Sequence, residues 1–487
     1  MNKYKKLTFI SIFLIPFLSS CNSNNMPDLG EKVESRTLEI YALNDFHGSF
    51  MYDESIKQTG FSKIGNFLLN EKKTNPENTI IISSGDMFQG GPESNITRGE
   101  ILIDAMNEIG FDAMAVGNHE FDWGEDILKE MESKMNFPLL CINAYYANSE
   151  TRPDYFAPST YVEKEGIRIG IIGSIYQNIA SSILPTIASK YNFVSPIDLI
   201  KAEAEKLRYT DYCDVILLST HDGQSSGYAS LVSEKDSSGN NFIDGLLLGH
   251  DHEKQSGFLD EDNKVPYVEG ACNGEFLSHI SLNLKLGDDN RYYVDSSKVE
   301  NIDTFTTFKD NSSEIDSIYQ KYADEIEPIR DEVLFNFDEK MSALEFGQFI
   351  AKSLLDYVNS LNKGYIASLG AINAGEGVRS DILEGEFTYG DLIKVYPFEN
   401  TLCVLKINPS DYMFRYYSNN SLIKATYNNQ TSPVINDDGF VFVATIDYIA
   451  YQVGYPKVEL FSYPELTCRD IVANNLKSIY EKGEVIN

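Results

Sequence analysis

The segment AVGNHEFDWG spans residues 115–124 and joins an apolar run to a cluster of polar side chains. The run stops at Gly117, Asn118 and His119 stand side by side after it, and Asp122 follows three residues later. The chain has only six histidines and one tryptophan, and one of each lies here. Taken alone, the segment is typical of a strand that ends in a polar loop, so its meaning depends on the rest of the chain.

The composition indicates a globular protein of two or three domains. The chain has 487 residues, of which 42% are hydrophobic, and this length exceeds that of one ordinary domain. The 73 acidic and 40 basic side chains give a formal charge of −33. This charge argues against binding of long nucleic acids, which need a basic surface. Small phosphate substrates stay compatible with it, because bound divalent cations can reverse the local field.

The N-terminus predicts a targeting segment. Three lysines in the first six residues precede LTFISIFLIPFL (7–18), an apolar run too short to span a bilayer. The following LSSC resembles a bacterial lipobox, so we expect a lipoprotein signal peptide over residues 1–20 and a lipid on Cys21. An ordinary signal peptide cleaved nearby is the alternative. Polar residues over 21–36 predict a tether, and hence an exported protein anchored to the bacterial envelope, in the periplasm or at the cell surface.

Apolar, β-branched runs that break off at polar residues recur through the first 300 positions. Segments 61–73 and 99–110 between them have apolar residues at helical spacing. Strands alternating with helices predict an α/β fold whose ligands gather at the strand ends. The runs are LEIYALNDFHG (38–48), NTIIISSGD (78–86), FDAMAVGNHE (111–120), IRIGIIG (167–173), CDVILLSTHDG (213–223) and IDGLLLGHDH (243–252).

The pattern of apolar and polar residues changes near residue 300. Segment 312–333 has an apolar face that runs from Ile315 to Val333 at helical spacing, and its Pro328 should kink the helix. Short strands and turns follow it. We therefore expect domains at 37–300 and 336–487, joined by a linker helix within 301–335.

Five of the six histidines lie in the strand-end clusters. Imidazoles and carboxylates in such positions are ligands for zinc, manganese and related ions. The DxH and HxH spacings put both members on one side of an extended backbone. Each cluster alone is weak evidence for a metal site, but together the clusters predict a dinuclear site. The clusters are Asp45 with His47, Asp86, Asn118 with His119, His221, and His250 with His252.

The series NDFHG, SGD, GNHEFDWG, STHDG and GHDH resembles the calcineurin-like metallophosphoesterases, over about residues 38 to 290. Within them it is similar to the bacterial 5′-nucleotidase and 2′,3′-cyclic phosphodiesterase family. The resemblance implies a four-layered α/β sandwich, a linker helix and a smaller α+β C-terminal substrate domain. It also implies two divalent ions, whose identity among Mn, Zn, Mg and Co the sequence leaves open.

The resemblance also implies a role for each site residue. One ion would be held by Asp45, His47 and His252, the other by Asn118, His221 and His250, with Asp86 bridging both. The neighbouring His119 is not a ligand in the family. It acts at the phosphoryl group as a cation or proton donor, held by Asp122. Glu120 and Trp123 are interpreted as structural, and so is His279, which lies in an alternating strand.

The second domain resembles the family's nucleotide-binding part less fully. Segment 372–402 is similar to its NGGGIR-type motif and PF.N turn, which assigns Asn373, Gly375, Arg379 and Phe398 to the substrate. The alternatives are a surface ion pair for Arg379 and a core position for Phe398.

Two departures stand out. An arginine that the family has near the start of a helix is missing from residues 339–357, which offer only Lys340, and a lysine is no equivalent replacement. The GGDG-type segment that positions a base-stacking aromatic is also missing, so Tyr451 or Tyr455 could take that role. A nucleoside 5′-monophosphate is the first expected substrate. A 2′,3′-cyclic nucleotide or 3′-nucleotide is the second, and a surface-binding lipoprotein with secondary catalysis is the third hypothesis.

Overall fold

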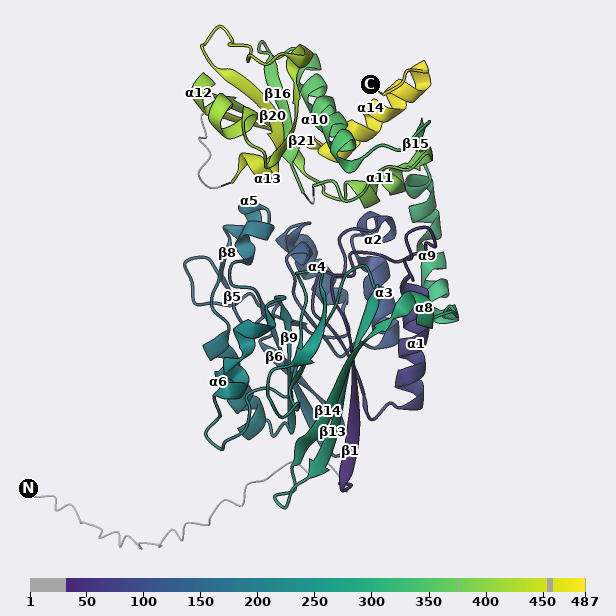
Figure 1. Cartoon of the computed structure of the whole chain (residues 1–487), viewed down its shortest axis with the longest axis vertical. Helices are drawn as coiled ribbons and strands as arrows, with labels where there is room; N and C mark the ends of the chain where they lie inside the picture. Colours follow the sequence, from purple (N-terminus) through teal and green to yellow (C-terminus); the bar gives the residue numbers. More distant parts are fainter. Residues whose placement is uncertain (1–31, 376, 453–458, 487) are drawn as a thin grey trace, which may run out of the picture.

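The computed structural model describes residues 32–375, 377–452 and 459–486. The expected signal peptide, Cys21 and Tyr455 lie outside these residues. Two parts of the chain are stacked along the long axis, and helix α9 (Ser313–Arg330) runs along one side of the molecule between them (Figure 1).

Two six-stranded sheets form the first part. Their central strands are parallel, and β13 pairs with β1 in the antiparallel sense. The first sheet has the order β14–β13–β1–β2–β3–β4, with β1 (Ser35–Leu43), β2 (Thr79–Ser83), β3 (Ala113–Ala115), β4 (Leu139–Leu140), β13 (Phe276–Leu286) and β14 (Tyr292–Asp303). The second has the order β11–β12–β10–β9–β7–β6, with β6 (Ser159–Lys164), β7 (Ile167–Ile175), β9 (Val215–His221), β10 (Gly245–Leu247), β11 (Lys254–Phe258) and β12 (Pro266–Gly270).

The sheets pack face to face, and helices cover both outer faces. Leu38 and Ile80 of the first sheet share one buried cluster with Ile169 and Val215 of the second. Separate apolar clusters attach the helices to each outer face. The result is the predicted four-layered sandwich. Its central strands are buried on both faces, which explains why they are apolar in nearly every position. The first sheet is covered by α1 (Phe61–Thr74), α3 (Glu100–Ile109) and α4 (Glu125–Lys134), the second by α6 (Ile197–Tyr209) and α7 (Ser230–Ser233).

Short elements complete the first part. They are α2 (Pro92–Ile96), β5 (Ala144–Tyr146), α5 (Pro185–Ala188), β8 (Tyr191–Phe193) and α8 (Thr304–Thr307). Among them, α2 and α5 lie at the end of the first part that faces the second part (Figure 1).

The linking helix is shorter than the sequence pattern suggested. Helix α9 begins after Ser312, whose side chain accepts a hydrogen bond from the Ile315 N–H, and it ends two residues after Pro328. Ile315 is buried, but Val333 is 36% exposed and already belongs to strand β15 (Val333–Phe337). The apolar face therefore stops before Val333, because the chain leaves the helix there.

The second part is a five-stranded sheet packed against helices. Helix α10 (Ala343–Ser360) starts with a capping box in which Ser342 and Glu345 bond each other's backbone N–H. The sheet has the order β19–β16–β20–β18–β21. Its strands are β16 (Ala367–Asn373), β18 (Thr401–Ile407), β19 (Leu422–Thr426), β20 (Val441–Ile446) and β21 (Glu459–Thr467), with β17 (Gly385–Thr388) paired to β15 and helices α11 (Tyr389–Val395), α12 (Pro409–Asp411), α13 (Asp447–Ala450) and α14 (Cys468–Lys482).

Three further features concern the end of the expected tether, the cysteines and the helices. Strand β1 begins at Ser35, so the last residues of the expected tether belong to the sheet. The five cysteines in the described residues are all free, and four of them are buried. Among the helices described, none has the length and apolar character of a membrane-spanning segment.

Candidate metal centre and substrate cleft

The predicted ligands converge because parallel strands end at the same edge of each sheet. Asp45 and His47 follow β1, Asp86 follows β2, and Asn118 follows β3. From the second sheet, His221 ends β9, and His250 and His252 follow β10. In three groups of side chains the candidate ligand atoms lie within 4.8 Å of one another. The groups are Asp45–His47–His252, Asp86–His221–His250 and His47–Asp86–His119.

Five of the seven predicted ligands have a left-handed backbone. Asp45, His47, Asp86, His250 and His252 have φ values of 47°, 49°, 55°, 88° and 58°. L-residues rarely adopt this conformation, which costs about 1–3 kcal/mol at each position. Strain of this kind persists where the surrounding structure enforces it, and it concentrates at functional sites.

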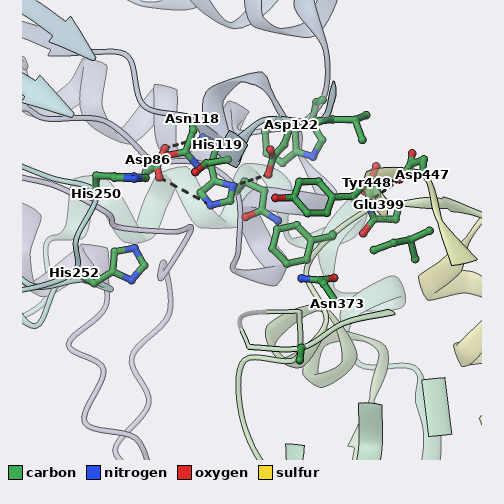
Figure 2. A pocket seen from close by; sticks show the side chains of 18 residues that line it. Asp86, Asn118, His119, Asp122, His250, His252, Asn373, Glu399, Asp447 and Tyr448 are labelled. Atoms are coloured by element: carbon green, nitrogen blue, oxygen red, sulfur yellow. Dashed lines mark hydrogen bonds and ion pairs between the residues drawn. The ribbon is translucent and has the colours of Figure 1, made fainter. Parts of the chain in front are cut away.

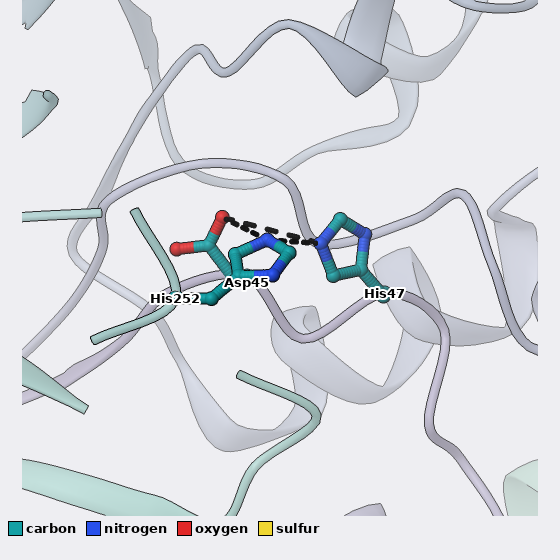
Figure 3. Close-up of side chains that lie close together, drawn as sticks. All are labelled: Asp45, His47 and His252. Carbon is teal, nitrogen blue, oxygen red and sulfur yellow. Dashed lines mark hydrogen bonds and ion pairs between the residues drawn. The ribbon is translucent and has the colours of Figure 1, made fainter. Parts of the chain in front are cut away.

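The first group directs acceptor atoms at one point (Figure 3). The Nδ1–H of His47 donates to the carbonyl of Gln89 at 3.1 Å, which leaves the Nε2 lone pair facing His252 Nε2 at 3.0 Å. His252 Nε2 lies 3.4 Å from Asp45 Oδ1, a buried oxygen with no hydrogen-bond partner among the described residues. Such converging lone pairs repel each other unless a cation lies between them, so these residues fit a divalent ion.

The second group has the same design. His221 donates from Nδ1 to the Ser84 carbonyl at 2.8 Å, and its Nε2 lies 3.0 Å from Asp86 Oδ2 and 3.1 Å from Asn118 Oδ1. Burial alone would lower the pKa of His221, but Asp86 and Asp45 raise it to about 10. The negative charge of these carboxylates attracts positive charge into the group, as a metal site requires.

Asp86 lies between the two groups, and Glu120 holds its loop. Glu120 accepts hydrogen bonds from the backbone N–H groups of Asp86 (2.9 Å), Met87 (2.9 Å) and Gly117 (2.7 Å). Burial, reinforced by the charge of Asp86, raises the pKa of Glu120 to about 7. Glu120 thus joins the loops after β2 and β3, which agrees with its structural interpretation.

His119 lies next to Asp86 and faces the cleft, and it is not part of the second ligand group. Its Nδ1 lies 2.7 Å from Asp122 Oδ2 and its Nε2 lies 4.0 Å from Asp86 Oδ2 (Figure 2). Burial would lower the pKa of His119, but Asp122 and Asp86 raise it. The pair with Asp122 therefore favours the protonated ring, in which Nδ1–H donates to Asp122 and Nε2 also carries a proton.

A cavity of about 300 Å³ lies between the two parts of the chain and opens onto His119 (Figure 2). Two of the four predicted substrate residues line it, Asn373 and Phe398. Gly375 and Arg379 are not among the lining residues. The guanidinium of Arg379 lies over the Phe398 ring, 5.4 Å from its centroid, and its charge acts to lower the pKa values of His47 and His119. Arg379 is therefore close to the cleft, and its contact with substrate stays a prediction.

Several cleft residues were not singled out by sequence reasoning. Tyr448, and not Tyr451, lines the cavity, and its hydroxyl donates to the Ser181 carbonyl of the first part at 2.7 Å. Glu399 also lines it and bridges Arg98 (2.6 Å) and Arg469 (2.9 Å). Tyr448 belongs to helix α13 and Glu399 occupies the variable position of the PF.N turn, so only the arrangement of the two parts shows that they face the cleft.

Lys340 does not replace the arginine that the family places near the substrate. Its ammonium lies 2.8 Å from Asp381 in a largely exposed ion pair, and it does not line the cleft. Lys340, one of the positions at which the second part departs from the family pattern, is therefore a surface residue.

Comparison with known proteins agrees with this architecture. The calcineurin-like phosphoesterase family matches residues 38–254, and the 5′-nucleotidase C-terminal domain matches residues 329–410. A 5′-nucleotidase of Vibrio parahaemolyticus is 26% identical over 444 residues, covering 81% of this chain and 76% of the relative. Endonuclease YhcR of Bacillus subtilis is also 26% identical, over 82% of this chain, but the chain spans only 33% of that protein. The crystal structure of a 5′-nucleotidase precursor from Thermus thermophilus superposes with a TM-score of 0.72 at 17% identity, covering 91% and 97% of the two chains.

Fold and ligand cluster together define a metallophosphoesterase, a hydrolase whose family uses divalent metals. The chain belongs to the calcineurin-like phosphoesterases that carry a 5′-nucleotidase C-terminal domain.

Proposed function

We propose that the protein hydrolyses nucleotide phosphate esters, with nucleoside 5′-monophosphates giving nucleoside and phosphate as its main reaction. One observation carries this proposal. The carboxylate–imidazole cluster and His119 share a single cavity with Asn373, Phe398 and Tyr448 of the second part. A phosphate at the cluster would place the attached nucleoside against these side chains, where Phe398 and Tyr448 offer faces for a base.

The chain's own residues would assist the displacement at phosphorus. Divalent ions held by the cluster supply Lewis acidity and a water nucleophile at neutral pH. His119, with its proton on Nε2, stabilises negative charge on the phosphoryl oxygens. As the bond from water to phosphorus forms and the ester P–O bond breaks, this proton passes to the departing alkoxide. Asp122 keeps His119 oriented and charged.

The ligand sets support two ions. One would be bound by Asp45, His47 and His252 and the other by Asn118, His221 and His250, with Asp86 shared, because its carboxylate lies within 4.8 Å of ligand atoms of both His47 and His221. Nitrogen and oxygen ligands suit Mn, Zn or Co, and Mg less well. On the substrate side we assign Asn373 and Phe398 to the nucleoside, and Gly375 and Arg379 to the same binding segment.

The location and domain division form a further part of the proposal. Residues 1–20 would be removed on export, Cys21 would carry the lipid, and the membrane would be reached through it. The chain would divide into domains at 37–300 and 336–487 around a linker within 301–335. Partition of the expressed protein into detergent, and its loss in a Cys21→Ala variant, would test the anchor.

The decisive experiment is phosphate release by residues 22–487 loaded with manganese. Metal-dependent release from AMP, abolished by EDTA, is the expected result. 2′,3′-Cyclic AMP, 3′-AMP and bis-p-nitrophenyl phosphate would be assayed in parallel. Turnover of these compounds without AMP turnover would replace the proposal with cyclic phosphodiesterase or 3′-nucleotidase activity. A metal-loaded protein inactive on all of them would contradict the enzyme proposal and support a binding role.

A further inference from the structure

Gln89 is a buried side chain whose amide has no partner. It is 1% exposed, and neither its Oε1 nor its Nε2 makes a hydrogen bond within the described residues. A buried polar group left without a partner destabilises a fold by about 1–3 kcal/mol. Native proteins retain few such groups, and each one calls for a specific explanation.

The position of Gln89 links the ligand cluster to the cleft. Its side chain lines the same cavity as His119 and Phe398, and its backbone carbonyl accepts the hydrogen bond from His47 Nδ1. Four other polar residues of the cavity are already engaged with protein groups. Asn118 contacts His221, Asp122 contacts His119, Asn400 donates to Asp447, and Glu399 bridges two arginines.

The backbone that follows Gln89 packs closely against the loop after β1. Gly90 has φ +144°, and a Cβ there would lie 2.4 Å from the His47 carbonyl oxygen. A Cβ on Gly91 would lie 1.8 Å from the carbonyl oxygen of Gly48. The N–H of Gly90 also donates to Asn95 Oδ1 at 2.8 Å. This close contact with the loop after β1 fixes the direction from which Gln89 enters the cleft.

We propose that Gln89 contacts the substrate directly, with its Nε2–H donating to a non-bridging oxygen of the scissile phosphate. This assignment rests on the proposed phosphoesterase function. A phosphate offers acceptor oxygens close to the ligand cluster, where His47 and His119 flank Gln89. Among the described residues, the cavity lining contains several carboxylates and no lysine or arginine. A lysine or arginine would pair with those carboxylates, whereas the neutral amide of Gln89 stays available to donate to a phosphate oxygen.

The test compares Gln89→Met with the wild-type chain in the metal-loaded protein. Methionine keeps the volume and removes both polar atoms. We expect kcat/KM to fall roughly 10- to 100-fold for both AMP and p-nitrophenyl phosphate, the loss of one hydrogen bond to a charged group. The melting temperature should stay equal or rise, because an unpaired amide has been removed, and the metal content should not change. Gln58→Met, at a half-buried glutamine outside the cavity lining that bonds the Met51 carbonyl, is the matched control.

Gln89→Glu tests which atom of the amide is used. Glutamate keeps the shape but loses the donor and adds a charge that repels phosphate, so this variant should be less active than Gln89→Met. Equal or higher activity of Gln89→Glu would overturn the donor assignment. A loss in Gln89→Met that affects AMP and spares p-nitrophenyl phosphate would also overturn it, since the contact would then be to the nucleoside.

Binding of inorganic phosphate separates this inference from the proposed function. Calorimetry on the metal-loaded protein should show weaker phosphate binding for Gln89→Met by a similar factor, whether or not AMP is turned over. A wild type that binds phosphate without hydrolysing esters would contradict the proposed function alone. Equal phosphate affinity and equal kcat/KM in wild type and variant would refute the role of Gln89, and so would a lowered melting temperature with unchanged kcat/KM.

Discussion

The two sides of the cleft are built in different ways. On the ligand side, Asp45, Asp86 and His252 sit on strained, left-handed backbone, and most of their polar atoms point at one another. On the opposite side, Phe398 lies in a turn before β18 and Tyr448 in the short helix α13, and this side contacts the first part through a few polar bonds. Metal coordination tolerates few ligand types and little displacement, whereas a base or sugar can be held by many surfaces. This difference explains why sequence motifs identify the ligand side of the cleft more fully than the side formed by the second part.

Removing the shared carboxylate should break the ligand side most completely. In Asp86→Asn the shape is kept, but the charge between the two ligand groups is lost. Loss of bound ions removes several kcal/mol of transition-state stabilisation, so AMP hydrolysis should fall by at least about 10,000-fold. Metal content by mass spectrometry and kcat measure the two effects. Asp310→Asn, at an exposed aspartate, is the control, and a variant with full metal content and activity would contradict the shared-ligand assignment.

His119 tests where the ligand cluster ends, because it also lies within 4.8 Å of His47 and Asp86 ligand atoms. If it acts on the phosphoryl group, His119→Ala should lower kcat roughly 100-fold or more and leave both ions in place. Asp122→Asn should cause a smaller loss, since it only orients the ring. Loss of one ion in His119→Ala would show instead that His119 is a ligand.

Phe398 tests the recognition side. Phe398→Ala should raise KM for AMP about 10- to 100-fold, the range for losing one base–aromatic stack, with little effect on kcat. Hydrolysis of p-nitrophenyl phosphate, which has no nucleoside, should change much less. Phe414→Ala removes a phenylalanine that is 79% exposed and outside the cleft, so it serves as the control. Equal losses on both substrates would place Phe398 in the catalytic side of the cleft.

His279 offers a contrast with the cleft histidines, because carboxylates flank it on the outer face of the first sheet. It lies 2.7 Å from Glu39 and 3.1 Å from Glu300, and its ring stacks on Tyr41. Burial would lower the pKa of His279, but the two glutamates raise it above the ordinary value of 6.5. The protonated ring therefore stabilises the fold below about pH 6.5, and this contribution is lost as the pH rises through the higher folded-state pKa.

The expected consequence is a small, pH-dependent effect. His279→Gln should lower the free energy of unfolding by up to about 1 kcal/mol at pH 6, as for partly exposed ion pairs. The difference should shrink toward pH 9, and metal content should be unaffected. Urea unfolding at both values measures it. A difference that grows with pH would show that neutral His279 is the stabilising form.

Prediction from sequence succeeded where chemistry restricts the choice of residue. The α/β class followed from β-branched runs that alternate with helical spacing, and the four layers followed from the family resemblance. The strand-end clusters of aspartate and histidine marked the residues that the structure brings together. It was less successful at the end of the linker helix and on the recognition side. There Tyr448 lines the cavity and Tyr451 does not, Gly375 and Arg379 lie off the cavity lining, and Tyr455 lies outside the described residues. Turn residues in the second part obey no periodicity, so their spacing does not show which of them face the cleft.

The sequence by itself determined the class of fold and the set of candidate metal ligands, because strand periodicity and the coordination preferences of ions act on residue type and local spacing. Only the tertiary structure decided which groups meet in the cleft. The unpaired amide of Gln89, the bridge from Glu399 to two arginines and the bond from Tyr448 to the first part each join residues distant in the chain, or depend on a partner being absent. Such relations arise from the packing of two parts against each other, which no local pattern encodes.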